Sequence, residues 1–339
     1  MAQRITRKQF LLGAGAVGSA AVLRPFRARA ARPTVIKLGL AMALDHPVTK
    51  HLIVAAGQIK KETNGEVVLQ VFPNNELGND THTLADVRSG AMQMMALGDN
   101  ILATLVPSAA VDNVGFAFKD AKAAFAALDG AVGEIVRSDI VKHGLQPMPA
   151  IWDLGLRQVA NSTRPIRTPE DLRGLKIRVP ESPSSFSLFK DLGAAPVAMN
   201  SADTYTALQT HVLDGTAIDL SSLETLKFYQ VQKYCSLTNH MWIGYWMLMN
   251  GPLWNRLPRD HQKVIAAVFD AEGLKERVVN EAFNNSLQGT LTSQGLTFNK
   301  TDPAPFKAML VKHGFYSYWQ KKLGSELWSA LEKYSGALA

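Results

Sequence analysis

Cysteine is almost absent from this 339-residue sequence, with Cys235 as its single representative. One cysteine excludes an intramolecular disulfide framework and any metal cluster held by cysteines. It does not exclude a location in an oxidising compartment, because large domains there need no disulfide bridges. The sequence also lacks a G-x-S-x-G elbow, an H-E-x-x-H pair and a P-loop. These missing motifs favour a binding protein over an enzyme, and nothing in the sequence implies a cofactor or a metal.

Acidic residues are missing from the first thirty positions, which contain six basic residues. This segment therefore accounts for most of the net charge of +7. The rest of the chain is nearly neutral and has no basic run with interleaved aromatic residues, so we expect no nucleic-acid partner. The basic residues of the first segment are Arg4, Arg7, Lys8, Arg24, Arg27 and Arg29.

The first thirty residues have the pattern of an export signal. A basic start precedes an apolar stretch at 10–23, which is shorter than the roughly 20 residues that span a bilayer, and Ala28-Arg29-Ala30 resembles a cleavage site. Residues 6–12, "TRKQFLL", resemble the twin-arginine motif, with Lys8 in place of the second arginine. We expect cleavage near Ala30 and a periplasmic location, and the choice between twin-arginine and general secretory export stays open.

The remaining chain alternates predicted strands and helices, which indicates an α/β protein with largely parallel sheets. It is longer than the roughly 250–300 residues at which single cores stop growing, so we expect two lobes. Thr168 and Ser201 are expected to cap helices, and the chain is expected to be mainly helical from Pro258. The predicted strands are 34–41, 67–73, 146–152, 175–180, 195–199, 216–220 and 236–250, and the predicted helices include 46–66, 81–90, 119–143, 184–193 and 202–215.

The polar residues that could catalyse a reaction are scattered. His46 and His51 are five residues apart, which is the wrong spacing for two ligands on one helix face, and Asp153, Asp219 and Glu224 do not define a carboxylate pair. We therefore expect no enzymatic activity, with a secreted enzyme acting on small acids as the less favoured alternative.

Several spaced motifs resemble one family, the solute-binding proteins of tripartite ATP-independent periplasmic (TRAP) transporters. The most characteristic region is 165–215, which contains "PIRTPEDLRGLKIRVPES". "DHPVTKHL", "ETNGEVVLQVFPNNELGND" and "KFYQVQKYCSLTNH" resemble the same family, in order along the chain. The resemblance implies a monomer that captures an organic acid and delivers it to the membrane permease subunits of the transporter. A sensor protein that presents the same ligand to a receptor is an open alternative.

The family fold implied by this resemblance has two α/β lobes, joined by crossing strands and by a long helix that spans both. The ligand would lie between the lobes, which close over it by a hinge motion. On this basis we assign 31–154 plus 244–283 to lobe I and 155–243 plus 284–339 to lobe II.

The resemblance also implies the main ligand contacts. Arg178, in the strand "GLKIRVP", matches the arginine that binds the ligand carboxylate in the family, and Arg157, in "WDLGLRQVANS", matches a second family arginine. A planar guanidinium can pair with a carboxylate through two hydrogen bonds, and exclusion of water strengthens the pair. We therefore expect Arg178 to be the anchor and Arg157 its helper.

Two departures from the family pattern concern the rest of the pocket. Ile218, next to Asp219 in "DGTAIDL", replaces an asparagine that often contacts the ligand, and Ser201 stands where a bulky aromatic residue is usual. We expect Ser201, Ile218 and Asp219 at the pocket, which the two changes predict to be roomier and less polar.

Aromatic residues in "HMWIGYWM" suggest an aromatic or apolar carboxylate as the ligand. In an alternating strand Trp242 and Trp246 share one face and Tyr245 lies on the other. We expect Trp242 and Tyr245 at the pocket, while ordinary core packing is an equal alternative for Trp242. His46 could donate to a ligand oxygen or could cap and pack its helix.

Overall fold

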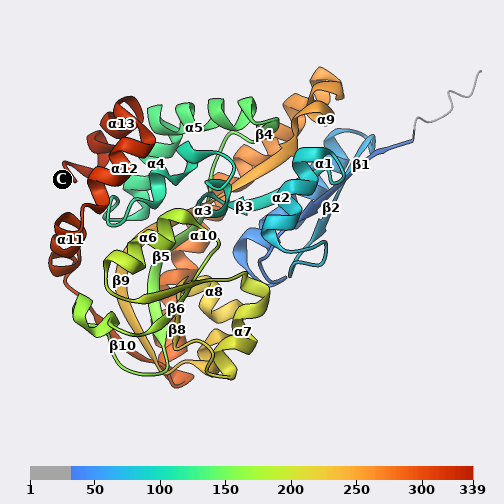
Figure 1. The fold of residues 1–339 in the computed structure, drawn as a ribbon. Helices are drawn as coiled ribbons and strands as arrows, with labels where there is room; N and C mark the ends of the chain where they lie inside the picture. Colours follow the sequence, from blue (N-terminus) through green and yellow to red (C-terminus); the bar gives the residue numbers. More distant parts are fainter. Residues whose placement is uncertain (1–31, 339) are drawn as a thin grey trace, which may run out of the picture. The chain divides into compact units, whose positions relative to one another are not determined.

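The computed structural model describes residues 32–338, in which helices cover a mixed β-sheet (Figure 1). The predicted export signal at 1–30, with its cleavage point near Ala30, lies outside the described residues. The alternating strands and helices confirm the α/β class.

Ten strands of the described residues share one sheet, in the order β2-β1-β3-β9-β5-β8-β6-β7, with β4 and β10 paired to β9. The strands β1, β2 and β3 form a parallel group on one side, and β6, β7 and β8 form a parallel group on the other. The central strands β5 and β9 are antiparallel to each other and to their neighbours β8 and β3. The prediction of largely parallel pairing therefore holds for the two side groups and for β10 with β9, but not for the rest of the centre. The strands are β1 (Thr34–Gly39), β2 (Val67–Phe72), β3 (Met94–Gly98), β4 (Leu145–Pro147), β5 (Trp152–Asn161), β6 (Lys176–Val179), β7 (Ala195–Ala198), β8 (Gly215–Asp219), β9 (Tyr234–Asn250) and β10 (Thr297–Lys300).

The 17-residue strand β9 links the two parallel groups. Its residues 245–249 pair with β3 and its residues 234–237 pair with β10, while β5 pairs with both parts. The register of β5 and β9 shifts between Arg157 and Val159, where Gln158 and Asn239 exchange two hydrogen bonds, of 2.7 and 3.0 Å. The apolar run that suggested a strand at 236–250 thus forms the centre of the sheet.

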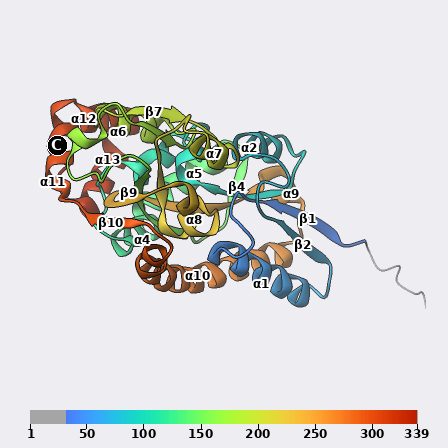
Figure 2. The ribbon, with the colours of Figure 1, turned by 90° about the horizontal axis from the view of Figure 1, so that it is seen from below.

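The longest helix among the described residues is α10, with 35 residues. It packs against α1, β5 and α8, and Figure 2 shows it running along one side of the sheet from α4 to α1. The helices are α1 (Pro47–Glu62), α2 (Asp80–Ser89), α3 (Asp99–Leu102), α4 (Ala121–Asp129), α5 (Ala131–Lys142), α6 (Pro183–Asp191), α7 (Ser201–Gln209), α8 (Leu220–Thr225), α9 (Gly251–Arg256), α10 (Arg259–Ser293), α11 (Pro303–Lys312), α12 (Phe315–Leu323) and α13 (Ser325–Ser335).

Polar side chains fix where several helices begin. Asn79, Ser182 and Asp302 each accept a hydrogen bond from a backbone N–H of the helix that follows. Thr168 precedes a short 3-10 helix at Pro169–Leu172, and its N–H donates to the Asp171 carboxylate at 3.0 Å. The predicted helix start at Thr168 is therefore confirmed.

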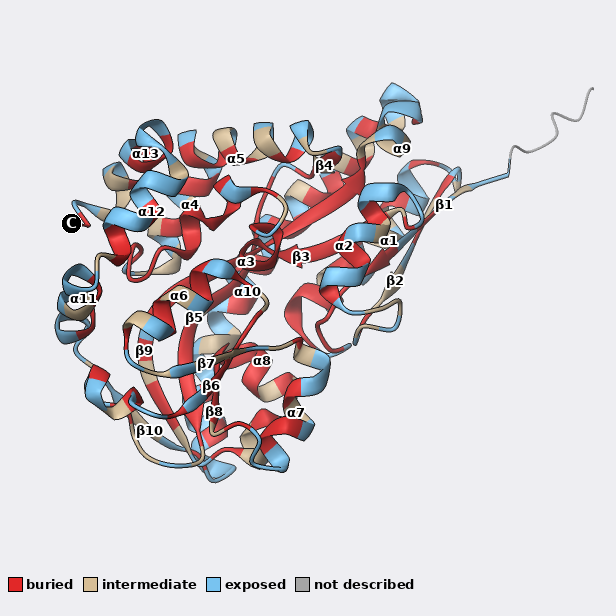
Figure 3. Ribbon diagram, in the orientation of Figure 1, coloured by how far each residue is buried: buried red, intermediate tan, exposed pale blue. Residues whose placement is uncertain are grey.

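The central strands carry most of the core. Figure 3 shows β5 and β9 as largely buried ribbons, while the outer faces of the helices are exposed. Trp152, Trp242 and Trp246 are among the largest fully buried side chains. Within residues 32–338 no helix has both the length and the apolar character needed to cross a membrane.

Two predicted elements are divided in the structure, and further elements were not predicted. The strand predicted at 146–152 is two strands, because β4 ends at Pro147 and β5 begins at Trp152. The helix predicted at 119–143 is divided at Gly130, which follows α4 and precedes α5. The strand β10 was not predicted, since its four residues lack a clear alternation of buried and exposed positions.

Candidate functional site

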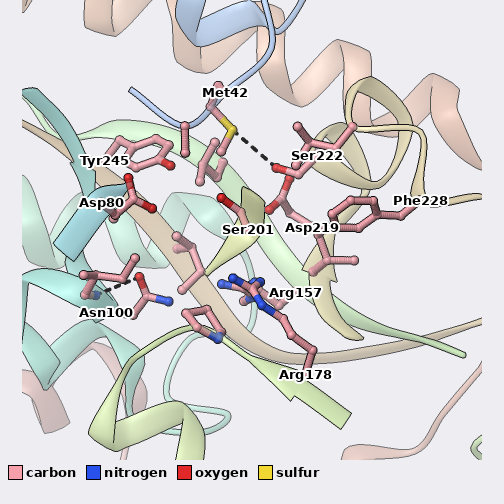
Figure 4. A pocket seen from close by; sticks show the side chains of 18 residues that line it. Met42, Asp80, Asn100, Arg157, Arg178, Ser201, Asp219, Ser222, Phe228 and Tyr245 are labelled. Carbon is pink, nitrogen blue, oxygen red and sulfur yellow. Dashed lines mark hydrogen bonds between the residues drawn. The ribbon is translucent and has the colours of Figure 1, made fainter. Parts of the chain in front are cut away.

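The candidate site is a cavity of about 470 Å³ at the carboxyl ends of both parallel groups of strands (Figure 4). Open α/β sheets bind ligands at this edge, because the segments that follow neighbouring parallel strands converge there. The cavity is lined by Ala41, Met42, Asp80, Gly98, Asn100, Ile101, Leu154, Arg157, Arg178, Pro180, Ser201, Ile218, Asp219, Ser222, Leu226, Phe228, Ile243 and Tyr245.

Arg178 projects into this cavity from the last part of β6. Its strand neighbours Ile177 and Val179 are fully buried, and Pro180 follows the strand. The guanidinium group uses Nε to donate to the Met199 carbonyl at 2.9 Å, while its two terminal nitrogens have no hydrogen-bond partner within 32–338. Burial, followed by the nearby positive charge of Arg157, lowers the pKa of Arg178 to about 9. The fold therefore holds a buried cation that lines the cavity, and its terminal N–H groups have no protein partner among the described residues.

Arg157 and Asp219 are directly paired residues of β5 and β8, so their side chains lie on the same face of the sheet. Nη2 of Arg157 donates to the Ala217 carbonyl at 2.5 Å. Burial lowers the pKa of Arg157, and the carboxylate of Asp219 opposes this effect. Asp219 also caps α8, because its Oδ1 accepts hydrogen bonds from the Ser222 N–H at 2.7 Å and the Ser221 hydroxyl at 2.8 Å.

Asp80, the first residue of α2, is a site residue that the sequence did not predict. The residue is 5% exposed, and its carboxyl group has no hydrogen-bond partner in the described part of the chain. The pKa of Asp80 is raised to about 6. Burial is the main cause of the rise, the positive charge of Arg178 opposes it, and the negative charge of Glu181 adds to it. The signal in the sequence was the "GND" stretch before the helix, but only the fold brings this stretch to β6.

Three buried polar atoms at the cavity wall lack a protein partner among the described residues: Nδ2 of Asn100, Nε of Arg157 and Oγ of Ser201. Buried polar atoms are normally hydrogen-bonded, so these three atoms leave hydrogen-bonding capacity for a polar ligand at the cavity. The prediction that Ser201 caps its helix is wrong. Ser201 is the first residue of α7 and Asn200 precedes it at the cap, which leaves the hydroxyl of Ser201 at the cavity.

Apolar side chains line the remaining wall. Ile218 and Tyr245, both expected at the pocket, lie there together with Met42 and Phe228. The mixture of two guanidinium groups, two carboxyl groups and an apolar wall suits a small organic anion. Among residues 32–338, no three His, Cys, Asp or Glu side chains are grouped as metal ligands would be.

His46 does not line the cavity but lies directly behind it. It caps α1, since its Nδ1 accepts a hydrogen bond from the Val48 N–H at 3.1 Å. Its Nε2 lies 3.1 Å from the hydroxyl of Ser221, which in turn donates to Asp219. Of the two expectations for His46, the structure therefore supports capping and packing, with an indirect link to the cavity through Ser221.

The burial of His46 predicts a pH-dependent contribution to stability. Desolvation lowers its pKa from 6.5 to about 4, although Asp219 and Asp45 oppose the shift. Because the folded pKa is below the unfolded one, the contribution is fully present above pH 6.5 and is lost as the pH falls toward 4. His46→Asn, which keeps a capping residue, should reduce this acid-induced loss by about 3 kcal/mol in urea unfolding experiments between pH 7.5 and 4.5. His82→Asn, at an exposed histidine, is the control, and parallel stability curves for His46→Asn and the wild type would contradict the assignment.

Trp242 does not form a wall of the cavity as expected. The alternation of β9 directs Ile243 and Tyr245 to the cavity and places Trp242 on the opposite face of the sheet. There its indole Nε1 donates to Asp153 at 2.8 Å, and its ring meets the edge of Phe125 at a centroid distance of 5.7 Å. Trp242 is a core residue.

Residues 39–316 match the sequence model of one protein family, which is described as bacterial extracellular solute-binding protein, family 7. The chain belongs to this family. At this level the protein is a solute-binding protein of TRAP transport rather than an enzyme, and such proteins bind small carboxylates and work with membrane permease components.

Two curated relatives of this family 7 protein illustrate its range. The 2,3-diketo-L-gulonate-binding periplasmic protein YiaO of Escherichia coli is 34% identical over 232 residues, which cover 68% of this chain and 70% of the relative. The C4-dicarboxylate-binding periplasmic protein DctP of Rhodobacter capsulatus is 34% identical over 234 residues, which cover 68% and 69%.

Solved structures show the same fold. A TRAP periplasmic solute-binding protein from Roseobacter denitrificans with bound β-D-glucuronate has a TM-score of 0.85 and 27% identity, covering 89% of this chain and 99% of that one. The sugar acid binding protein DctPAm from Advenella mimigardefordensis, in complex with galactonate, has a TM-score of 0.85 and 26% identity, covering 91% and 99%. The family 7 protein therefore has the two-lobe periplasmic binding protein fold, with a long helix that spans both lobes.

Proposed function

We propose that this protein captures an organic acid in the periplasm by binding its carboxylate at Arg178, and that it delivers the acid to the permease subunits of a TRAP transporter. The observation that carries the proposal is the buried guanidinium group of Arg178, whose terminal nitrogens face the cavity without a partner in residues 32–338. A buried cation of this kind is costly until an anion neutralises it, so a carboxylate gains both charge pairing and hydrogen bonds.

Arg157 has a supporting role in this proposal. Arg157 lines the same cavity, and its buried Nε has no protein partner among residues 32–338 and could donate to the acid as the cavity adjusts around it. Ser201 and Asn100 add a hydroxyl and an amide that can complete the hydrogen bonds of the acid.

The apolar wall supports an acid with an apolar or aromatic face. Met42, Ile218, Phe228 and Tyr245 provide this wall, whereas Trp242 lies on the other side of the sheet and makes no contribution. Either an aromatic ring or the C–H face of a flexible chain could pack against these side chains.

The domain organisation is part of the same proposal. We assign lobe I to 31–154 plus 244–283 and lobe II to 155–243 plus 284–339, with removal of residues 1–30 on export. The charged residues of the cavity come from both assigned lobes, Asp80 from the first and Arg157, Arg178 and Asp219 from the second. Closure of a monomer around the acid would then exclude water from these charges.

A thermal-shift screen tests the proposal. The mature chain, residues 31–339, is heated with a panel of carboxylic acids and with the amide or alcohol that corresponds to each acid. An acid at 100 times its dissociation constant should add about 2.7 kcal/mol to stability, while its uncharged counterpart should add little. Equal stabilisation by acids and uncharged counterparts, or no response to any acid, would contradict carboxylate capture.

A further inference from the structure

The cavity is lined by equal numbers of positively and negatively charged side chains. Arg157 and Arg178 are its cations, and Asp80 and Asp219 are its anions; all four residues are at most 5% exposed. In Figure 4 both guanidinium groups lie at one end of the cavity, with Asp80 and Asp219 on opposite sides of it. With all four groups ionised, the cavity has no net charge before the ligand enters.

Asp219 limits what Arg157 can offer to a ligand. The two residues are paired in register across β5 and β8, and the carboxylate of Asp219 stabilises the charged form of Arg157. The carboxylate of Asp219 thus offsets part of the charge of Arg157, and Arg178 remains the principal attachment point for a ligand anion. A second anionic group would have to approach Asp80 or Asp219.

The carboxylates of Asp80 and Asp219 also restrict which ligand groups can lie next to them. An ionised carboxylate only accepts hydrogen bonds, so its partners must be donors such as hydroxyl groups. Oδ1 of Asp219 is occupied by Ser221 and Ser222, while its Oδ2 and both oxygens of Asp80 have no hydrogen bond within the described chain. A hydroxyl on the ligand can satisfy these oxygens, whereas a second carboxylate would face like charges in a site screened from water.

We propose that Asp80 and Asp219 make the cavity selective for hydroxylated acids with a single carboxylate, and that they reject the corresponding dicarboxylates. The inference rests on the proposed function, because it takes Arg178 as the site of the carboxylate. Asp80 and Asp219 are then specificity residues that accept hydrogen bonds from the hydroxyl groups of the ligand.

Matched pairs of ligands test this selectivity in isothermal titration calorimetry. L-Threonate and L-tartrate, and D-galactonate and galactarate, differ only in whether the end of the chain is a hydroxymethyl group or a carboxylate. In the wild-type protein we expect the monocarboxylate of a pair to bind at least about tenfold more tightly than the dicarboxylate.

The variants Asp80→Asn and Asp219→Asn remove one negative charge each at nearly constant shape, and asparagine keeps the capping function at position 219. Each should reduce the preference for the monocarboxylate by about tenfold. Glu224→Gln is the matched control, since it removes a charge from α8 without changing the cavity lining, and it should leave the preference unchanged.

The outcomes separate this inference from the proposed function. If the dicarboxylate binds as tightly as its partner in the wild type, or if neither asparagine variant changes the ratio, the selectivity is overturned while acid binding stands. If no member of either pair binds and no acid of the wider panel stabilises the protein, both the proposed function and this inference are contradicted.

Discussion

Arg178→Ala should weaken binding of the captured acid by about 2–5 kcal/mol, or roughly 30- to 4,000-fold in dissociation constant. The substitution removes the buried guanidinium group whose terminal nitrogens face the cavity. The other cation of the cavity lining, Arg157, is paired in the sheet with the carboxylate of Asp219 and cannot replace Arg178. Calorimetric titration of the wild type and the variant with the same acid measures the effect.

The stability of the ligand-free variant separates loss of binding from loss of folding. Within residues 32–338, Arg178 makes a single hydrogen bond, through Nε to the Met199 carbonyl, and burial together with Arg157 already disfavours its charge. Removal of this charge should therefore leave the unliganded protein at least as stable as the wild type. Arg178→Lys is the second control: it keeps a positive charge but loses the planar fork, so its affinity should be intermediate. Wild-type affinity in Arg178→Ala would show that the acid binds elsewhere.

Trp242→Ala should lower the free energy of unfolding by about 3–5 kcal/mol, as is usual when a buried tryptophan is truncated. The indole ring is 1% exposed, packs on Phe125 and donates to Asp153, which also accepts a hydrogen bond from Asn280 at 3.0 Å. Truncation leaves a cavity and removes one of the donors that stabilise the buried carboxylate of Asp153. Urea unfolding monitored by far-UV circular dichroism measures the loss.

The position of Trp242 also makes a prediction about binding. Trp242→Phe retains a ring and loses the indole hydrogen bond, so it should lower stability by about 1–3 kcal/mol. It should leave the dissociation constant of the acid within about twofold, because the side chain lies on the face of β9 away from the cavity. Tyr245→Phe is the contrasting variant, since Tyr245 lines the cavity. A large loss of affinity in Trp242→Phe would restore Trp242 as a ligand contact.

The arrangement of elements could be read from the sequence because each strand has a local pattern. Alternation of Ile177 and Val179 with charged residues marked β6, and the long apolar run marked β9. The division at Gly130 and the two separate strands around 148–151 were missed, since helical and apolar patterns continue across both points.

The site was only partly predictable, since tertiary packing decides which face of a strand meets the cavity. Alternation separates Trp242 from Tyr245 but does not say which of them faces the ligand. Asp80 lies far from Arg178 in the sequence, and its role depends on how α2 and β6 come together at one edge of the sheet. The sequence predicted Arg157, Arg178 and Asp219 at the pocket, whereas the carboxylate of Asp80 became visible only in three dimensions.

A crystal structure of the mature protein with its most stabilising acid is the most direct test of carboxylate capture by Arg178. The account predicts that the carboxylate of the ligand pairs with the terminal nitrogens of Arg178, inside the cavity bounded by Asp80, Asp219 and Tyr245. An acid bound in that cavity with its carboxylate away from Arg178, or bound at another site such as the cavity beside Phe116 and Lys307, would contradict it.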